Sequence, residues 1–320
     1  MTDSYTTPVS IIVRALNEAK FLPECLQKIS EQNYGGPVEV VVVDSGSTDD
    51  TVEIASDFGA KVINISKSVF TYGRSLNVGC EASSGECLVL LSAHCIPCDE
   101  NWLKDLVNPL EEGISEYSYG RQLPRSGVSK FSEGMVFQKY YPEVGAIPQV
   151  GYFCNNANSA ILRSTWKRLR FNEKLTGLED LELAKRLVDS GGTVSYVGSS
   201  AVEHIHEESW SRVKIRYERE AAALVDIEPS LNLSVSQALQ LFVLSTFNDF
   251  RSMNKRCIST IFEIILYRAC QYYGSFVGSR ASKHRIRKMR NEYFYPRIQD
   301  KVVSLGEPNG HNRTSSHESS

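Results

Sequence analysis

Two adjacent carboxylates in the second half of the sequence could transfer a proton during catalysis. Glu179 and Asp180 open the segment LEDLELAKRLVDS, residues 178–190, whose apolar residues recur at helical spacing. We expect the pair at a helix N-terminus, where a carboxylate can take the proton of an attacking hydroxyl group. Adjacent residues on a helix point about 100° apart, so only one of them would face a substrate. The alternative is that both only stabilise the helix through its dipole.

A third carboxylate follows a buried strand in the sequence VVVDSGSTDDT. Asp44 ends the apolar run, and Ser45, Gly46 and Ser47 leave the backbone free to approach a ligand. A carboxylate at this place can accept hydrogen bonds from a base N–H or a ribose hydroxyl, which suits nucleotide recognition. The alternative is that Asp44 caps the next helix. The GxGxxG and GxxxxGK[ST] motifs are missing from the sequence, which argues against a dinucleotide fold and a P-loop.

A histidine follows one of the buried strands that the sequence predicts. His94 comes directly after the apolar run ECLVLLS and two small residues, and the later sequence VEHIH supplies His204 and His206. Residues two apart on a strand face the same side, so both could approach one ligand. Imidazole binds Mn²⁺ or Zn²⁺ but suits Mg²⁺ poorly. Cys95 and Cys98 form a CxxC without a second pair, so we expect them to pack rather than to bind zinc.

The elements that must position these residues alternate between strand and helix signals. Apolar runs predict strands at Val9–Ala15, Val38–Asp44, 60–65 and 86–92, with helical patterns between them. Parallel strands need such crossovers, so we predict an α/β fold with a mainly parallel sheet and helices on both faces. Ligands bind beyond the carboxyl ends of the strands of such sheets. The segments to inspect are therefore 15–18, 44–47, 66–74 and 92–95.

The middle of the chain is harder to interpret. Residues 116–150 begin with the strand-like YSYGRQ and continue with poor periodicity. This stretch could be an acceptor-binding insertion or a plain loop.

The last third of the sequence changes to helical patterns. Apolar residues of 235–242 and 258–269 recur at helical spacing and predict a helical hairpin. Residues 280–290 then carry six Lys or Arg and no acid. They either bind anionic lipid headgroups, with the hairpin in the membrane interface, or form an exposed basic segment of a soluble hairpin.

Composition limits the classes of function. The chain has 320 residues, a net charge of -3 and a pI near 6.1, which leaves no whole-molecule charge for nucleic-acid binding. Eight cysteines are too sparse for a disulfide scaffold, and residues 2–4 lead directly into a strand without a signal peptide. We therefore expect reduced thiols and a cytoplasmic protein. No segment is apolar enough for a convincing transmembrane helix.

Four motifs together resemble family 2 glycosyltransferases of the GT-A fold, and within them the bacterial rhamnosyltransferase-like branch. The motifs are VSIIVRALNEAKFLPECLQKI, VEVVVVDSGSTDDT, GRSLNVGCEASSGECLVLLSAHCIP and LEDLELAKRL, and the resemblance covers about residues 8 to 220. It implies a Rossmann-like GT-A sheet followed by a C-terminal helical extension. We divide the chain into a catalytic domain at 1–225, a helical extension at 226–300 and a disordered tail at 301–320.

The resemblance also implies roles for individual residues. Asp180 would be the catalytic base of an inverting transfer, with Glu179 binding the acceptor or supporting the structure. The nucleotide-sugar site would be made by Ala15, Asn17, Glu18, Asp44, Ser45, Arg74, Asn77, Ser92 and Ala93. Arg74 and Asn77 would lie by the ribose or diphosphate.

The metal site of the family departs from its usual form here. The family usually carries a DxD-like motif after the fourth strand, and this chain has Ser92, Ala93 and His94 in its place. Three interpretations follow. His94 and His204 hold Mn²⁺ or another divalent metal, or a protonated His94 stabilises the leaving diphosphate together with Arg74, or the site is inactive.

The expected function is transfer of a sugar from a nucleoside-diphosphate donor to a glycan or lipid-linked glycan acceptor in cell-surface polysaccharide synthesis. The expected place of action is the inner face of the membrane. Arg216 and Arg219, three apart on a helical pattern, either clamp a phosphate or lie on a solvated face. The competing function is a catalytically silent protein that binds nucleotide sugars or glycans. A nucleotidyltransferase would need a Gly- and Lys-rich first loop, which ALNEAKF does not supply.

Overall fold

The computed structural model describes residues 7–253 and 257–281. Its strands are β1 (Val9–Ala15), β2 (Val38–Asp44), β3 (Lys61–Asn64), β4 (Cys87–Ser92), β5 (Cys95–Pro97), β6 (Tyr117–Leu123), β7 (Asn158–Leu162) and β8 (Val194–His204). They form one sheet in the order β3-β2-β1-β4-β7-β6-β8-β5. The predicted bounds of β1 and β2 are confirmed: both strands are rich in β-branched residues, which are buried in β1 and at 41–43 in β2.

The sheet has a parallel half and a mixed half. β1, β2, β3 and β4 pair in parallel, as the alternation of strands and helices predicts. β7 then enters antiparallel to both β4 and β6, while β6 and β8 pair in parallel. β5 closes the edge antiparallel to β8, with Cys95 opposite His204. This last pairing brings the end of β8 to the segment that follows β4.

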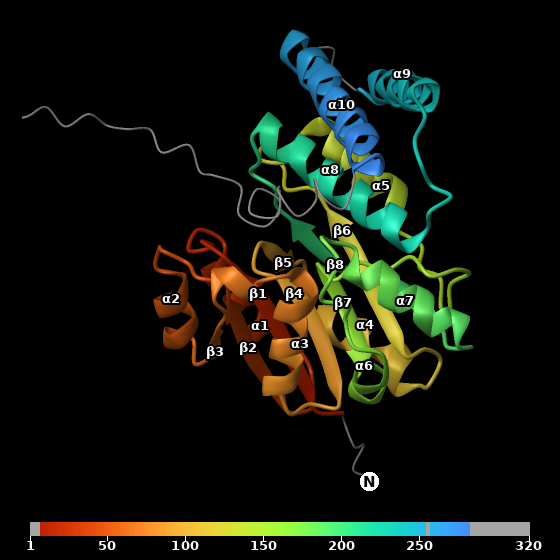
Figure 1. The fold of residues 1–320 in the computed structure, drawn as a ribbon. Coiled ribbons are helices and arrows are strands. Elements are labelled where there is room, and N and C mark those ends of the chain that lie inside the picture. Colours follow the sequence, from red (N-terminus) through yellow and green to blue (C-terminus); the bar gives the residue numbers. More distant parts are fainter. Residues whose placement is uncertain (1–6, 254–256, 282–320) are drawn as a thin grey trace, which may run out of the picture.

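Helices cover both faces of the sheet, as predicted (Figure 1). One face is covered by α1 (Leu22–Ser30), α2 (Thr51–Asp57) and α4 (Trp102–Glu111), which pack on Val9, Ile11 and Val13. The other face is covered by α3 (Tyr72–Ala82), α6 (Arg163–Leu169) and α7 (Glu179–Asp189), which pack on Ile12 and Val43. Alternate residues of β1 therefore supply both cores.

The segment 116–150 contains a helix that the sequence did not predict, α5 (Phe131–Tyr140). Its apolar periodicity is weak because Ser132 and Glu133, both polar, are among its buried residues. α5 lies against the C-terminal helices, where the Ser132 hydroxyl donates a hydrogen bond of 2.6 Å to Asp249.

The C-terminal helices are α8 (Trp210–Ile227), α9 (Val235–Ser252) and α10 (Ile258–Ser279), and the predicted hairpin is present as α9 and α10. α10 packs closely along α8, and glycines allow this approach. A Cβ atom at Gly274 would lie 2.4 Å from the Lys214 carbonyl oxygen, and one at Gly278 would lie 2.0 Å from the Glu218 carbonyl oxygen. Figure 1 shows these helices beyond the end of β8. In the described part of the chain, no helix is both long and apolar enough to cross a membrane.

Parts of the sequence-based division fall outside the description. The basic segment 280–290, apart from its first two residues, and the predicted tail 301–320 lie outside the described residues. The boundary at residue 225 stays a prediction.

Candidate active site

The loops that follow β1, β2 and β4 meet at one edge of the sheet. The Ala93 N–H donates to the Arg14 carbonyl at 3.1 Å, and the Ser45 N–H donates to the Ala15 carbonyl at 3.1 Å. Ala15, Ser45 and Ala93 are buried. These backbone contacts bring three of the four inspected segments together, as expected for the carboxyl ends of neighbouring parallel strands.

The carboxylate of Asp44 is hydrogen-bonded to the turn that follows β2. It accepts hydrogen bonds from the N–H of Gly46 at 2.8 Å and of Ser47 at 3.0 Å, and also from the Ser47 hydroxyl. The side chain is buried, and helix α2 has Asp50 at its N-cap position instead. The expected helix-capping alternative for Asp44 is therefore wrong, and contact with a base would have to use the carboxylate lone pairs that the turn leaves.

Asn17 joins the first loop to the second. It has a positive φ of 55°, and its Oδ1 accepts from the Thr48 N–H at 2.8 Å. The Asn17 N–H donates to the Ser47 hydroxyl at 2.8 Å. Positive φ is sterically costly except for Gly, Asn and Asp, so the residue type fits this local backbone. The two loops thus form one rigid rim of the site.

Two predicted donor-binding residues have other partners. Asn77 is buried, and its Nδ2 donates to the Phe171 carbonyl and to Glu173, both at 2.9 Å. Its Oδ1 accepts from Trp166 Nε1 and from the Phe171 N–H, both at 3.1 Å. All four hydrogen-bonding positions of this amide are occupied, so the prediction that Asn77 contacts ribose or diphosphate is corrected to a structural role. Arg74 pairs with Glu173 at 3.4 Å and is half exposed.

The acidic pair lies at the start of α7, as predicted. Asp180 is buried, and its oxygens accept from the N–H groups of Asn156 and Leu181, each at 2.8 Å. Burial first, and then the charge of Glu179, raise the pKa of Asp180 to about 7. Glu179 pairs with Arg14 at 3.3 Å. The two neighbours therefore differ in environment, and their roles as base and supporting residue stay predictions.

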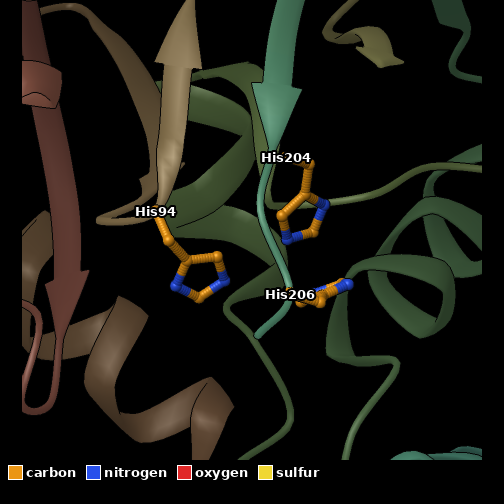
Figure 2. A group of neighbouring side chains, drawn as sticks. All are labelled: His94, His204 and His206. Atoms are coloured by element: carbon orange, nitrogen blue, oxygen red, sulfur yellow. The ribbon is translucent and has the colours of Figure 1, made fainter. Parts of the chain in front are cut away.

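His94, His204 and His206 form a compact cluster (Figure 2). The ring centroids of His94 and His204 are 5.2 Å apart and nearly parallel, and His206 lies 4.1 Å from His204 and 5.6 Å from His94. One nitrogen of each ring lies within 4.8 Å of the others. The sequence analysis named His94 with His204 as a metal pair and allowed His206 to approach the same ligand, and the three rings lie together.

Each imidazole of this cluster is oriented through its Nδ1 atom. That atom lies 2.7 Å from Glu18 Oε1 in His94, 2.7 Å from Gln122 Oε1 in His204 and 2.8 Å from Glu133 Oε1 in His206. Because carboxylate and amide oxygens only accept, each Nδ1 must carry the proton. The Nε2 lone pair of every neutral ring is then left for another ligand.

The two inner histidines titrate differently. Burial works against protonation of His94, but the charge and hydrogen bond of Glu18 exceed it and raise the pKa of His94. Burial and the charges of His206 and His94 hold the pKa of His204 well below its ordinary value. His204 is therefore neutral under physiological conditions.

Arg216 is held in ion pairs rather than directed at a ligand. It lies 2.8 Å from Glu133 and 2.9 Å from Glu208. Burial opposes the ionised form of Glu208, but the charges of Arg216 and His206 lower its pKa to about 2. Both acids compensate Arg216, which is largely buried and so does not lie on a solvated face; the other alternative, a phosphate clamp, is disfavoured by these two carboxylates.

Arg219 and Arg14 both lie against the ring of Tyr72. The guanidinium carbon of Arg219 lies 4.6 Å from the Tyr72 ring centroid, and that of Arg14 lies 5.3 Å from it. Within the described residues, Nε of both arginines is buried without a hydrogen-bond partner. Arg14 also lies 3.3 Å from Glu179 and Arg219 lies 3.5 Å from Glu220, and the two Nε–H groups without a partner can donate to a further anion.

Several of these residues were missed by sequence reasoning. Arg14 was the one signal available, since it is a charge inside the otherwise apolar run VSIIVRA. Gln122, Glu133 and Asn156 carried no signal, because each acts through a contact distant in sequence.

The comparisons with known proteins agree with this architecture. Residues 10–168 match the family described as Glycosyl transferase family 2. The O-antigen chain rhamnosyltransferase RfbN of Salmonella typhimurium is 27% identical over 62% of this chain and 66% of its own length. The corresponding enzyme WbaN of Salmonella anatum is 28% identical over 53% of this chain and 57% of its own. The chain thus spans less than two thirds of these relatives.

Solved structures show the same fold. A mannosyltransferase from Pyrobaculum calidifontis, in complex with GDP-Man and Mn²⁺, aligns with a TM-score of 0.55 and 19% identity over 84% of this chain and 70% of its own. Glucosyl-3-phosphoglycerate synthase from Mycobacterium tuberculosis aligns with a TM-score of 0.51 and 20% identity over 69% and 79%. The fold is GT-A, and residues 10–168 form a glycosyl transferase family 2 domain, in a chain that resembles the O-antigen rhamnosyltransferases.

Proposed function

We propose that this protein is an inverting glycosyltransferase that moves a sugar from a nucleoside-diphosphate donor to a glycan or lipid-linked glycan acceptor. The carrying observation is the buried Asp180 at the start of α7, whose pKa is raised to about 7 by burial and the charge of Glu179. A base that is near half-ionised at neutral pH is suited to accept a hydroxyl proton. Family membership and the O-antigen relatives support synthesis of a cell-surface polysaccharide.

The proposed step is a single displacement. Asp180 takes the proton of the acceptor hydroxyl while its oxygen attacks the anomeric carbon, and the bond from that carbon to the diphosphate oxygen breaks on the opposite face. The electron pair leaves with the diphosphate. Arg14 and Arg219 supply positive charge in the same site, with Nε atoms that the protein itself does not use. We assign them the place that the sequence analysis gave to Arg74 and Asn77.

The donor's nucleotide would lie on the rim made by the first two loops. The side chains of Asn17 and Asp44 accept from backbone N–H groups of this rim, and the Ser45 N–H donates to the Ala15 carbonyl. Ala15, Ser92 and Ala93 are buried and form its floor. The mannosyltransferase structure contains GDP-Man, and a structure of glucosyl-3-phosphoglycerate synthase contains UDP. A panel of nucleotide sugars tests which base this protein binds.

The histidine cluster fits a divalent transition metal. His94, His204 and His206 would hold it through Nε2, because their Nδ1 atoms are bound by Glu18, Gln122 and Glu133. Such an all-imidazole set suits Mn²⁺ or Zn²⁺ and suits Mg²⁺ poorly. When bound, the ion would offset negative charge on the leaving diphosphate. If Mn²⁺ does not raise the melting temperature, the cluster does not bind metal. The interpretations with a protonated His94 or an inactive site would then be favoured.

Slow hydrolysis of the donor tests this function. Purified protein is incubated with UDP-, dTDP-, GDP- and CDP-sugars, and release of the nucleoside diphosphate is followed by chromatography. We expect release from one donor class and its loss in Asp180→Asn. Asp189→Asn, at the far end of α7 and paired with Lys185, is the matched control and should retain it. Binding of a donor without any release in the wild type would indicate the catalytically silent binding protein instead.

A further inference from the structure

The C-terminal hairpin buries polar side chains and exposes many apolar ones. In α9 the buried residues are the polar Thr246 and Asp249. Its exposed large apolar residues are Val235, Leu239, Leu241, Val243, Leu244 and Phe247. A helix that packs on a protein core in water normally buries its apolar side. α9 instead leaves six of its large apolar residues exposed, and only Phe242 and Phe250 are half-buried.

α10 carries a second exposed apolar face. Its exposed large apolar residues are Ile258, Phe262, Ile265, Leu266 and Tyr273, at i, i+4, i+7, i+8 and i+15. This spacing places them on one side of the helix. The opposite side packs on α8 and buries Tyr267, Gln271 and Gly274. The apolar side of α10 therefore points away from the rest of the protein.

Three charged residues of the hairpin make contacts on its inner side. Arg268 makes two contacts of 2.7 Å with the carboxylate of Asp249, and both residues are buried. Asp249 also accepts from the Ser132 hydroxyl of α5 at 2.6 Å. Glu263 accepts from the Phe131 N–H at 2.5 Å. Among the charged residues of α9 and α10, Arg251 alone is exposed, and it is basic.

We propose that the outer surface of α9 and α10 docks on a lipid bilayer that carries anionic headgroups. We call its eleven exposed residues, named above, the apolar surface. Neither helix is able to cross a bilayer, so the hairpin would lie in the plane of the membrane interface. Arg280 follows α10 directly and opens a segment of eleven residues with six Lys or Arg and no acid. This charge complements anionic lipid.

The same charge disfavours the other occupant of such a surface. A second copy of the chain would bring a second segment 280–290 of equal sign to the interface, and like charges repel. A bilayer satisfies both features at once, because its interior accepts the apolar residues and its headgroups accept the basic ones.

Docking would place the active site near the lipid surface. Arg216 of α8 contacts Glu133 of α5, which in turn contacts His206 of the histidine cluster. Figure 1 shows α8 between α10 and the strand ends. The hairpin is thus joined to the catalytic edge of the sheet through one helix. An acceptor anchored in the membrane could reach this site, although docking itself does not depend on the proposed transferase activity.

Vesicle sedimentation tests the proposal. The full chain is mixed with vesicles of phosphatidylcholine alone or with three parts in ten phosphatidylglycerol, and the bound fraction is measured. We expect binding to the anionic vesicles and a loss of about tenfold in partition coefficient in the triple variant Leu239→Gln, Phe247→Gln and Phe262→Gln. The matched control is Val144→Gln with Val150→Gln, which are 81% and 105% exposed in another part of the molecule and should not change binding.

Two results would overturn the proposal. One is a wild-type protein that stays in the supernatant with both vesicle types. The other is a dimer in light scattering that the triple variant converts to a monomer, since this would assign the apolar surface to a second copy. Donor hydrolysis and the melting temperature, measured in parallel, should be the same in the triple variant and the wild type. Loss of hydrolysis in all proteins with vesicle binding retained would contradict the proposed function but not the docking.

Discussion

Nδ1 of His94 lies 2.7 Å from Oε1 of Glu18, so the loop after β1 fixes the ring that follows β4. A carboxylate behind an imidazole sets its tautomer and makes Nε2 a better metal ligand. The glutamate that the sequence analysis assigned to the nucleotide is thereby also a positioning residue for the histidine cluster. Four predictions follow from this and related contacts.

Removal of an imidazole should abolish metal binding. With Mn²⁺ added and then with EDTA, the melting temperature of the wild type should rise and fall back, because a ligand stabilises the state that binds it. His94→Ala should lose this response, and bound metal measured by mass spectrometry should fall with it. His317→Ala, which leaves all three imidazoles of the cluster in place, is the control. An unchanged Mn²⁺ shift in His94→Ala would exclude the cluster as the site.

Glu18→Gln should weaken metal binding without removing a ligand. Loss of the carboxylate behind a metal-bound histidine typically costs 10- to 100-fold, roughly, in affinity. Titration of Mn²⁺ followed by calorimetry measures this change. Glu207→Gln, which affects an exposed pair with Lys20, should leave the affinity as it is. Equal affinities in Glu18→Gln and the wild type would show that the Glu18–His94 contact has no part in metal binding.

The rate should depend on pH through Asp180. The carboxylate must be ionised to accept a proton, and its pKa is raised to about 7 by burial and then by Glu179. We therefore expect kcat/KM for donor turnover to rise about tenfold per pH unit below that value and to level off above it. Glu179→Gln removes the like charge and should shift this limb to lower pH. A rate that is flat from pH 5 to 8 would be expected of an ordinary Asp with a pKa of about 3.9 and would contradict the assignment.

The sequence could predict the parts of this site that depend on neighbouring residues, but not those that depend on contacts distant in sequence. β1 and β2 were predicted to the residue, since their apolar runs bury locally on both faces. Asn77 was misassigned, because nothing in a helical sequence shows that residues 171–173 saturate its amide. The sequence analysis placed His204 and His206 on one strand, whereas β8 ends at His204 and His206 lies beyond it.

The long-range part of the histidine cluster illustrates the same limit. His94 and His204 are joined by β5, a strand of three residues too short to produce a pattern. The resemblance to a family suggested their proximity, and the alternation of residues along β8 did not. Glu133 lies on α5, a helix that the sequence did not predict because polar residues are among its buried positions. Ion pairs between distant elements leave no spacing in a sequence.

The buried pair of Asp249 and Arg268 should be essential to the C-terminal hairpin as a pair rather than singly. Asp249→Ala would leave the Arg268 guanidinium buried without its bidentate partner, since the remaining bonds of that residue are to Gln271 and the Ser132 carbonyl. Breaking such a pair typically costs about 3–5 kcal/mol, whereas apolar replacement of both partners is often neutral. We therefore expect Asp249→Ala to lower the free energy of unfolding by that amount in urea titration. The double variant Asp249→Leu with Arg268→Met should recover most of it. If the double variant were as unstable as the single one, the pair would contribute attraction beyond mutual compensation, and the inward charges would stabilise the hairpin directly.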